Sequence, residues 1–169
     1  MLEPLLDFLG DAWDVIKPWQ IIDEDEAGLI LRLGKLNRTL TSGFHWKWPC
    51  LEQPRVCNTA VDILNLNEQT IETDDGAQVT ISCVVNYHVH NPSKALLKIT
   101  DYDECIADAC YGEIGMAVAD NLNEDLNTEE FRDLLRDLCH KQTVKFGVTI
   151  NSVGIENLCK ARALRHFGV

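Results

Sequence analysis

The sequence has 169 residues, of which 46% are hydrophobic, and this is enough chain to bury a core without disulfides. With 15 Lys and Arg against 27 Asp and Glu, the formal net charge is −12, so the chain lacks the basic surface that binds nucleic-acid phosphates. No stretch approaches the roughly 20 apolar residues of a membrane-spanning helix, and no signal peptide is recognisable. These values make nucleic acid a poor candidate partner and exclude an integral span, so any attachment to a membrane is expected to be peripheral.

The first segment, residues 1–19, is predicted to form an amphipathic helix that breaks at Pro18. Four carboxylates lie on its polar side, whereas interfacial helices usually carry Lys and Arg there. Two interpretations have equal weight: the helix docks in a lipid interface, or it packs on the domain or on another subunit. The candidate docking residues of this segment are Leu5, Phe8, Leu9, Trp13, Ile16 and Trp19.

From residue 20 onward the pattern changes to short apolar runs separated by Gly, Asn and Asp, which is typical of antiparallel strands. An acidic run over 23–26 and the sequence Thr41-Ser42-Gly43 are expected to be turns. The expected strands in this part of the chain are 21–22, 29–33, 44–48 and 56–66.

The clearest local signal is Asp75-Gly76, a favoured hairpin turn between strands over 69–73 and 78–90. Apolar and mostly polar residues alternate along the second strand, so one face is expected to be core and the other solvated. Such a sheet is typically covered by helices on its apolar face. The elements expected next are a helix over 95–99, a helix capped by Asp101, a helix from Asn127 to Gly147 and a strand over 148–155.

The residue types that perform catalysis or bind metals do not combine into a site. His88 and His90 point to the same face of a strand, but two ligands do not make a metal site. Cys139 and His140 are neighbours on a predicted helix and diverge by about 100°, so they do not form a nucleophile with its base. The seven cysteines are expected to be reduced, and most of them buried. We expect no catalytic residue, no metal and no cofactor.

Three blocks, in this order, resemble the SPFH domain, also called the band 7 or prohibitin-homology domain, with the stomatin branch closest. The first block is residues 20–53, which contain an LRLG strand followed by GFHWKWP. The second is residues 70–96, with the Asp-Gly turn, the strand that ends in YHVH, and NPSKAL. The third is residues 147–158, GVTINSVGIENL. The blocks cover nearly everything after the first helix, and their order makes the resemblance fairly specific.

The resemblance implies an α+β domain over residues 20–158, with a curved, mainly antiparallel sheet and helices packed on it. It also implies a non-enzymatic scaffold that attaches to membranes, assembles with itself or with SPFH homologues, and organises partners such as membrane proteases. By position, the block that approaches the membrane is Phe44, His45, Trp46, Lys47 and Trp48, whose rings and cation suit a lipid-headgroup boundary. Packing within the sheet is the alternative for Trp46 and Trp48.

The sequence departs from the family pattern at both ends. Family members usually begin with a hydrophobic hairpin or a transmembrane helix, whereas the acidic segment 1–19 stands first here. They usually continue into a long coiled coil, whereas only a short helix over 159–169 is expected here. We expect peripheral attachment to the cytoplasmic side of a membrane. The alternative is a soluble interaction domain whose first helix binds a partner groove.

Overall fold

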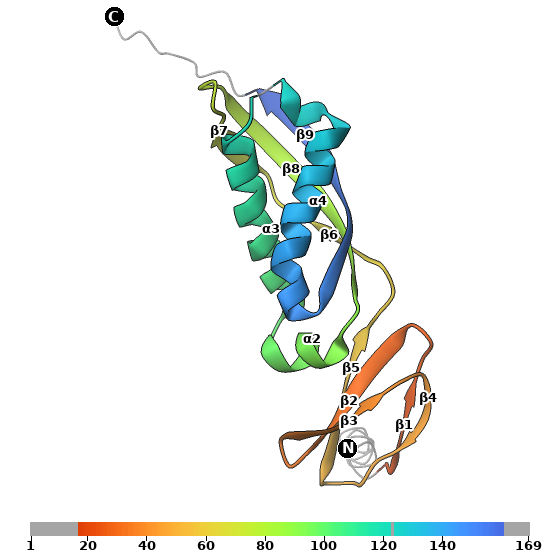
Figure 1. Ribbon diagram of the computed structural model, residues 1–169. Coiled ribbons are helices and arrows are strands. Elements are labelled where there is room, and N and C mark those ends of the chain that lie inside the picture. Colours follow the sequence, from red (N-terminus) through yellow and green to blue (C-terminus); the bar gives the residue numbers. More distant parts are fainter. Residues whose placement is uncertain (1–16, 123, 161–169) are drawn as a thin grey trace, which may run out of the picture. The chain divides into compact units, whose positions relative to one another are not determined.

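The computed structural model describes residues 17–122 and 124–160 (Figure 1). These residues form antiparallel sheets with helices packed on them, so the predicted α+β class is confirmed. They group into two compact units, one that ends at Ala60 and one that begins at Val61.

Within the described residues, the first unit contains two small antiparallel sheets. Their strands are β1 (Trp19–Ile22), β2 (Glu26–Arg32), β3 (Lys35–Leu40), β4 (Gly43–Trp46) and β5 (Glu52–Asn58). One sheet pairs β1 with β4, and in the other β2 lies between β3 and β5. The expected strand over 29–33 and the expected turn at 41–43 are therefore both close to their predicted places.

A small apolar cluster holds the first unit together. Ile22 of β1, Ile30 of β2 and Leu40 of β3 are buried against one another, and burial of each side chain is worth roughly 1.5–3 kcal/mol. Gly28 lies where β2 and β5 approach closely, since a Cβ atom there would meet the carbonyl oxygen of Arg55 at 2.6 Å. The strands can therefore pair at this point only because residue 28 lacks a side chain.

The second unit is a four-stranded antiparallel sheet with helices on one face (Figure 1). Its elements are β6 (Asp62–Asn65), β7 (Gln69–Glu72), β8 (Gln78–Val89), α2 (Pro92–Lys98), α3 (Tyr102–Ala119), α4 (Glu129–Thr143) and β9 (Val148–Lys160). β9 pairs with the whole length of β8, whose other edge pairs with β7 near one end and with β6 near the other. β8 is therefore the central strand.

The buried face predicted for β8 is confirmed, and it defines the core of the second unit. The apolar residues Val79, Ile81, Cys83, Val85, Tyr87 and Val89 are all buried. The buried side chains of α3 and α4 cover this face. The opposite face, expected to be solvated, is only partly exposed, and Ser82 on that face is buried. The hairpin turn is also as expected, because Gly76 has a φ of 73° and donates its N–H to the carbonyl of Thr73.

Helix boundaries follow local capping. As predicted, Asp101 caps α3, accepting hydrogen bonds from the N–H groups of Asp103 and Glu104. The predicted cap at Asn127 is wrong by one residue, because the hydroxyl of Thr128 accepts the N–H of Phe131 at 3.2 Å and starts α4.

Two strand boundaries also differ from expectation. The strand expected over 56–66 is two strands, because the side chain of Asn58 accepts the N–H of Ala60 at 2.7 Å and turns the chain. The short helix expected over 159–169 does not begin there, since Cys159 and Lys160 pair with β8 as the end of β9. Residues 161–169 lie outside the described residues.

Candidate docking surface

The outer face of the β1–β4 sheet carries a row of large apolar side chains. Trp19 pairs directly with Trp46, and Ile21 pairs directly with Phe44. Residues that pair directly, and residues two apart along a strand, project from the same face of a sheet. These four side chains therefore form one surface, which we call the apolar ladder. Phe44 is 65% exposed and Trp46 is 54% exposed, while Trp19 is half-buried.

The inner face of the same sheet fixes which way the ladder points. Ile22 projects from that face and is buried in the cluster of the first unit. His45 also projects from it, half-buried, with its Nε2 atom 2.6 Å from the carbonyl oxygen of Thr41. Rotating β1 and β4 to bury the ladder would expose Ile22, so the core of the unit holds the ladder outward.

A buried carboxylate shapes the turn that follows β4. Glu52 accepts hydrogen bonds from the side-chain amide of Asn37 at 3.0 Å and from the backbone N–H of Trp48 at 3.1 Å. Arg38 lies 3.8 Å from the same carboxylate and also donates to the carbonyl of Trp46. Glu52 thus ties β3 to the turn, and the turn presents the indole of Trp48, which is 60% exposed.

Of the residues predicted to dock, some are exposed and others are buried, because side chains alternate between the two faces of a strand. Phe44, Trp46 and Trp48 are exposed. The alternative prediction, that the two tryptophans pack within the sheet, is therefore wrong. Lys47 differs from the expectation of a headgroup contact, because it falls between outward positions and is only 9% exposed. The predicted docking residues of the first segment, Leu5, Phe8, Leu9, Trp13 and Ile16, lie outside the described residues.

Four exposed apolar residues of the first unit were not predicted as docking residues. Ile21 belongs to the ladder, and its alternation with buried Ile22 is the sequence pattern that could have revealed it. Leu33 and Leu51 are exposed in the turns next to β2 and β5, and Leu36 is exposed near the start of β3. No motif marks these leucines, because their exposure depends on the tertiary fold.

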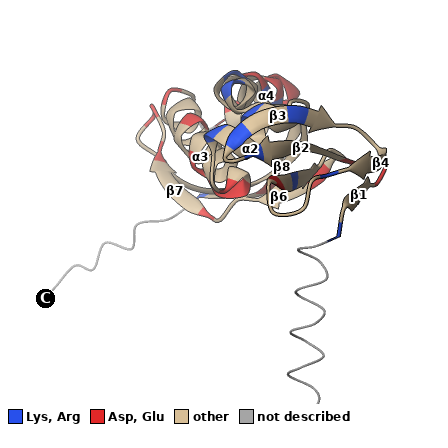
Figure 2. Ribbon diagram, turned by 90° about the horizontal axis from the view of Figure 1, so that it is seen from below, with Lys and Arg blue, Asp and Glu red and all other residues tan. Residues whose placement is uncertain are grey.

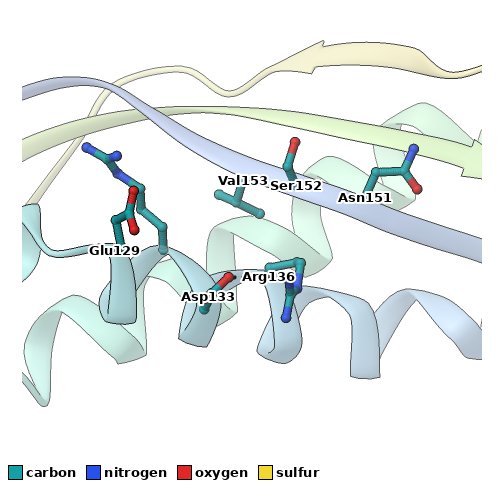
Figure 3. A pocket seen from close by; sticks show the side chains of 7 residues that line it. Glu129, Asp133, Arg136, Asn151, Ser152 and Val153 are labelled. Carbon is teal, nitrogen blue, oxygen red and sulfur yellow. Dashed lines mark ion pairs between the residues drawn. The ribbon is translucent and has the colours of Figure 1, made fainter.

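A second surface feature lies between α4 and β9, where a polar hollow of about 300 Å³ opens (Figure 3). Glu129, Asp133 and Arg136 project from α4, and Asn151 and Ser152 border the hollow from β9. Arg136 pairs with Asp133 at 3.2 Å, so charges of opposite sign offset each other. Arg132 also lines the hollow, so two arginines balance Glu129 and Asp133, and the hollow presents no excess charge to select a ligand.

The histidine pair considered for metal binding makes ordinary sheet contacts. His88 Nδ1 lies 2.9 Å from the side-chain oxygen of Asn151, and His90 Nδ1 lies 3.0 Å from the hydroxyl of Thr149. Burial, together with the nearby positive charge of Lys94, lowers the pKa of His90 below its usual value. Over residues 17–122 and 124–160, no three His, Cys, Asp or Glu side chains gather as metal ligands do.

Within the described part of the chain, no helix combines the length and the apolar character needed to cross a bilayer. The longest described helix, α3, carries Asp103 and Glu104 in its first turn.

Relatives of known sequence share most of this chain. An uncharacterized protein of Methanocaldococcus jannaschii is 27% identical over 146 residues, which are 85% of this chain and 73% of that protein. A putative band 7 family protein of Acanthamoeba polyphaga mimivirus is 22% identical over 83% of this chain and 47% of its own. The Escherichia coli protein HflK, named as a modulator of FtsH protease, is 27% identical over 80% of this chain.

The matching region is only part of several of these proteins, since it spans 33% of the Escherichia coli protein and less than half of the mimivirus one. A family model described as SPFH domain / Band 7 family matches residues 20–163, which includes both units of the fold. The chain therefore belongs to the SPFH/band 7 family.

Proposed function

We propose that this protein is a non-enzymatic scaffold that docks peripherally on a membrane and organises membrane proteins there. The observation that carries the proposal is the apolar ladder, in which paired side chains of β1 and β4 face solvent while the other face of their sheet is core. Large apolar surfaces of this kind on a folded unit usually mark an interaction site. Trp48, held by Glu52, enlarges the surface on the turn after β4.

The composition of the ladder favours a lipid interface as the surface it meets. Two of its four members are tryptophans, and indole rings favour the headgroup boundary, where an apolar body and a polar N–H are both accommodated. Lys17 lies above the ring of Trp19, 5.9 Å from its centre, and places a cation beside the ladder. A cation beside exposed aromatic rings suits a surface that carries phosphate groups.

Family membership supports the scaffold part of the proposal. The relative in Escherichia coli is named as a modulator of FtsH protease, and a role of the same kind is proposed for this chain. We propose that its partners are other SPFH proteins, further copies of itself, and membrane proteases. The proposed location is the cytoplasmic side of the membrane.

Co-sedimentation with phosphatidylcholine vesicles tests the docking surface. The wild-type protein should pellet with the vesicles, and the double variant Phe44→Ser, Trp46→Ser should remain in the supernatant. The matched control is Met116→Ser with Leu122→Ser, which removes comparably exposed apolar groups from the second unit and should pellet normally. Pelleting of the double variant at the wild-type level, or no pelleting of the wild type, would overturn the proposal.

Mass measurement in solution tests the scaffold against a simple interaction domain. Light scattering with and without vesicles should show larger assemblies when lipid is present. A monomer that ignores lipid, and whose Phe44→Ser, Trp46→Ser variant behaves identically, would instead favour a domain that binds a protein groove.

A further inference from the structure

The hairpin that joins β2 to β3 has an unusual residue at its tip. Arg32 and Lys35 are the last paired residues, so the connecting loop is Leu33-Gly34. Both loop residues have positive φ, 50° for Leu33 and 80° for Gly34, as a type I′ turn requires. Asn, Asp and Gly favour the first position of such a turn, and a leucine there is sterically strained.

Burial does not compensate for this strain. Leu33 is 77% exposed, the highest value among the large apolar residues that the structure describes. Its N–H donates to the carbonyl of Leu51 at 3.1 Å, which brings the turn after β4 next to the hairpin. Leu36 and Leu51 are exposed as well. We call Arg32, Leu33, Lys35, Leu36 and Leu51 the hairpin tip.

The charges of the hairpin tip oppose folding as well. Arg32 and Lys35 lie directly opposite each other on neighbouring strands, and like charges in this position repel. On its other side Arg32 pairs with Glu52 of β5, whose carboxylate is hydrogen-bonded to Asn37 and Trp48 and lies 3.8 Å from Arg38. The side chains of Arg32 and Lys35 are both exposed, and none of the ion pairs among the described residues includes either of them. Two independent features at one turn therefore reduce local stability, which is typical of a site kept for binding.

Charge is distributed unevenly along β2. The acidic run 23–26 leads into β2, whereas Arg32 is its last residue and Lys35 is the first residue of β3 opposite it. Figure 2 shows basic segments along β3 in blue. The seven residues of β2 separate its two ends by about 20 Å, at roughly 3.3 Å per residue. That separation exceeds the Debye length of about 8 Å at physiological ionic strength, so the acidic run does not cancel the cations of the tip.

We propose that the hairpin tip inserts Leu33 into a membrane that contains anionic phospholipids, while Arg32 and Lys35 bind the lipid phosphates. This rests on the proposed membrane docking and adds the class of lipid that is selected. An anionic surface removes both local costs, because it neutralises the facing cations and covers the exposed leucines. The apolar ladder binds the membrane independently of lipid charge, and the hairpin tip selects membranes that contain anionic phospholipids.

Vesicle binding with two lipid compositions tests the selection. The wild-type protein should bind phosphatidylcholine mixed with phosphatidylserine about 25-fold more tightly than pure phosphatidylcholine, at about fivefold for each of two cations. The variant Arg32→Gln, Lys35→Gln should lose this preference and keep its binding to pure phosphatidylcholine. The control Lys98→Gln, Lys141→Gln makes the same charge change at exposed positions of the second unit and should keep the preference.

A second variant separates a binding role from a structural one. Leu33→Asn places the preferred residue in the turn, so it should raise the melting temperature while weakening binding to both kinds of vesicle. Equal binding of the wild type to both compositions, or an unchanged preference in Arg32→Gln, Lys35→Gln, would overturn the inference about the hairpin tip. The proposal that the apolar ladder docks on the membrane would still stand. If the wild-type protein does not bind pure phosphatidylcholine vesicles at all, the docking proposal itself would be overturned.

Discussion

Replacing Trp46 by alanine should weaken vesicle binding by an amount that can be worked out from its exposure. An aromatic side chain offers about 200 Å² of surface, so the 54% of Trp46 that is exposed corresponds to about 110 Å². At about 25 cal/mol per Å², full coverage of this area by lipid is worth about 2.7 kcal/mol. Immersion of half of it is worth about 1.4 kcal/mol, so we expect an affinity loss between about 10-fold and 100-fold.

The assay is a titration of the protein with phosphatidylcholine vesicles, with bound and free protein separated by sedimentation. Trp46→Phe is the conservative comparison, since it keeps most of the apolar area and should lose less affinity than Trp46→Ala. Because Trp46 is mostly exposed, neither change should lower the melting temperature appreciably. A folded Trp46→Ala protein that binds within twofold of wild type would refute the assignment of this face to lipid.

Three further predictions concern the stability and the core of the two units. Gly147→Ala should destabilise the protein by more than about 2 kcal/mol in thermal or urea unfolding, because Gly147 has a φ of 83° and its Cβ would lie 2.6 Å from a carbonyl oxygen at the start of α2. Glu52→Ala should lower stability by about 2 kcal/mol, because it leaves the N–H of Trp48 without its carboxylate acceptor. A thiol reagent at neutral pH should label Cys50 and Cys159 rapidly, and labelling of the core thiols before unfolding would contradict the structure. The core thiols are Cys57, Cys83, Cys110 and Cys139, and burial raises the pKa of Cys57 and raises that of Cys83 to about 12.

Local chemistry made much of the second unit predictable. The Asp75-Gly76 turn specifies its own backbone conformation, and β8 carries buried apolar residues at alternate positions from Val79 to Val89. The cap at Asp101 is likewise a contact between near neighbours in sequence. These features depend on residues close together in the chain, so a single sequence is enough to find them.

The docking surface was only partly predictable, because it depends on contacts distant in sequence. The direction of Trp46 follows from pairing with Trp19, which lies in another strand, and the next residue, Lys47, is buried with its N–H hydrogen-bonded to the carbonyl of Pro18. Leu33 escaped prediction for a different reason. A leucine is disfavoured at the first position of a type I′ turn, so Leu33 was expected to be the last residue of the strand over 29–33, whereas the chain turns there.

The pairing of β8 with β9 has a consequence for biosynthesis. Val79 pairs with Lys160, so the central sheet joins segments from opposite ends of the second unit. On the ribosome, one edge of β8 stays unpaired until β9 has been made, and such distant pairing slows folding. During that interval the emerging chain presents an open, apolar strand edge, which is the type of surface that chaperones shield and that nascent chains use to aggregate.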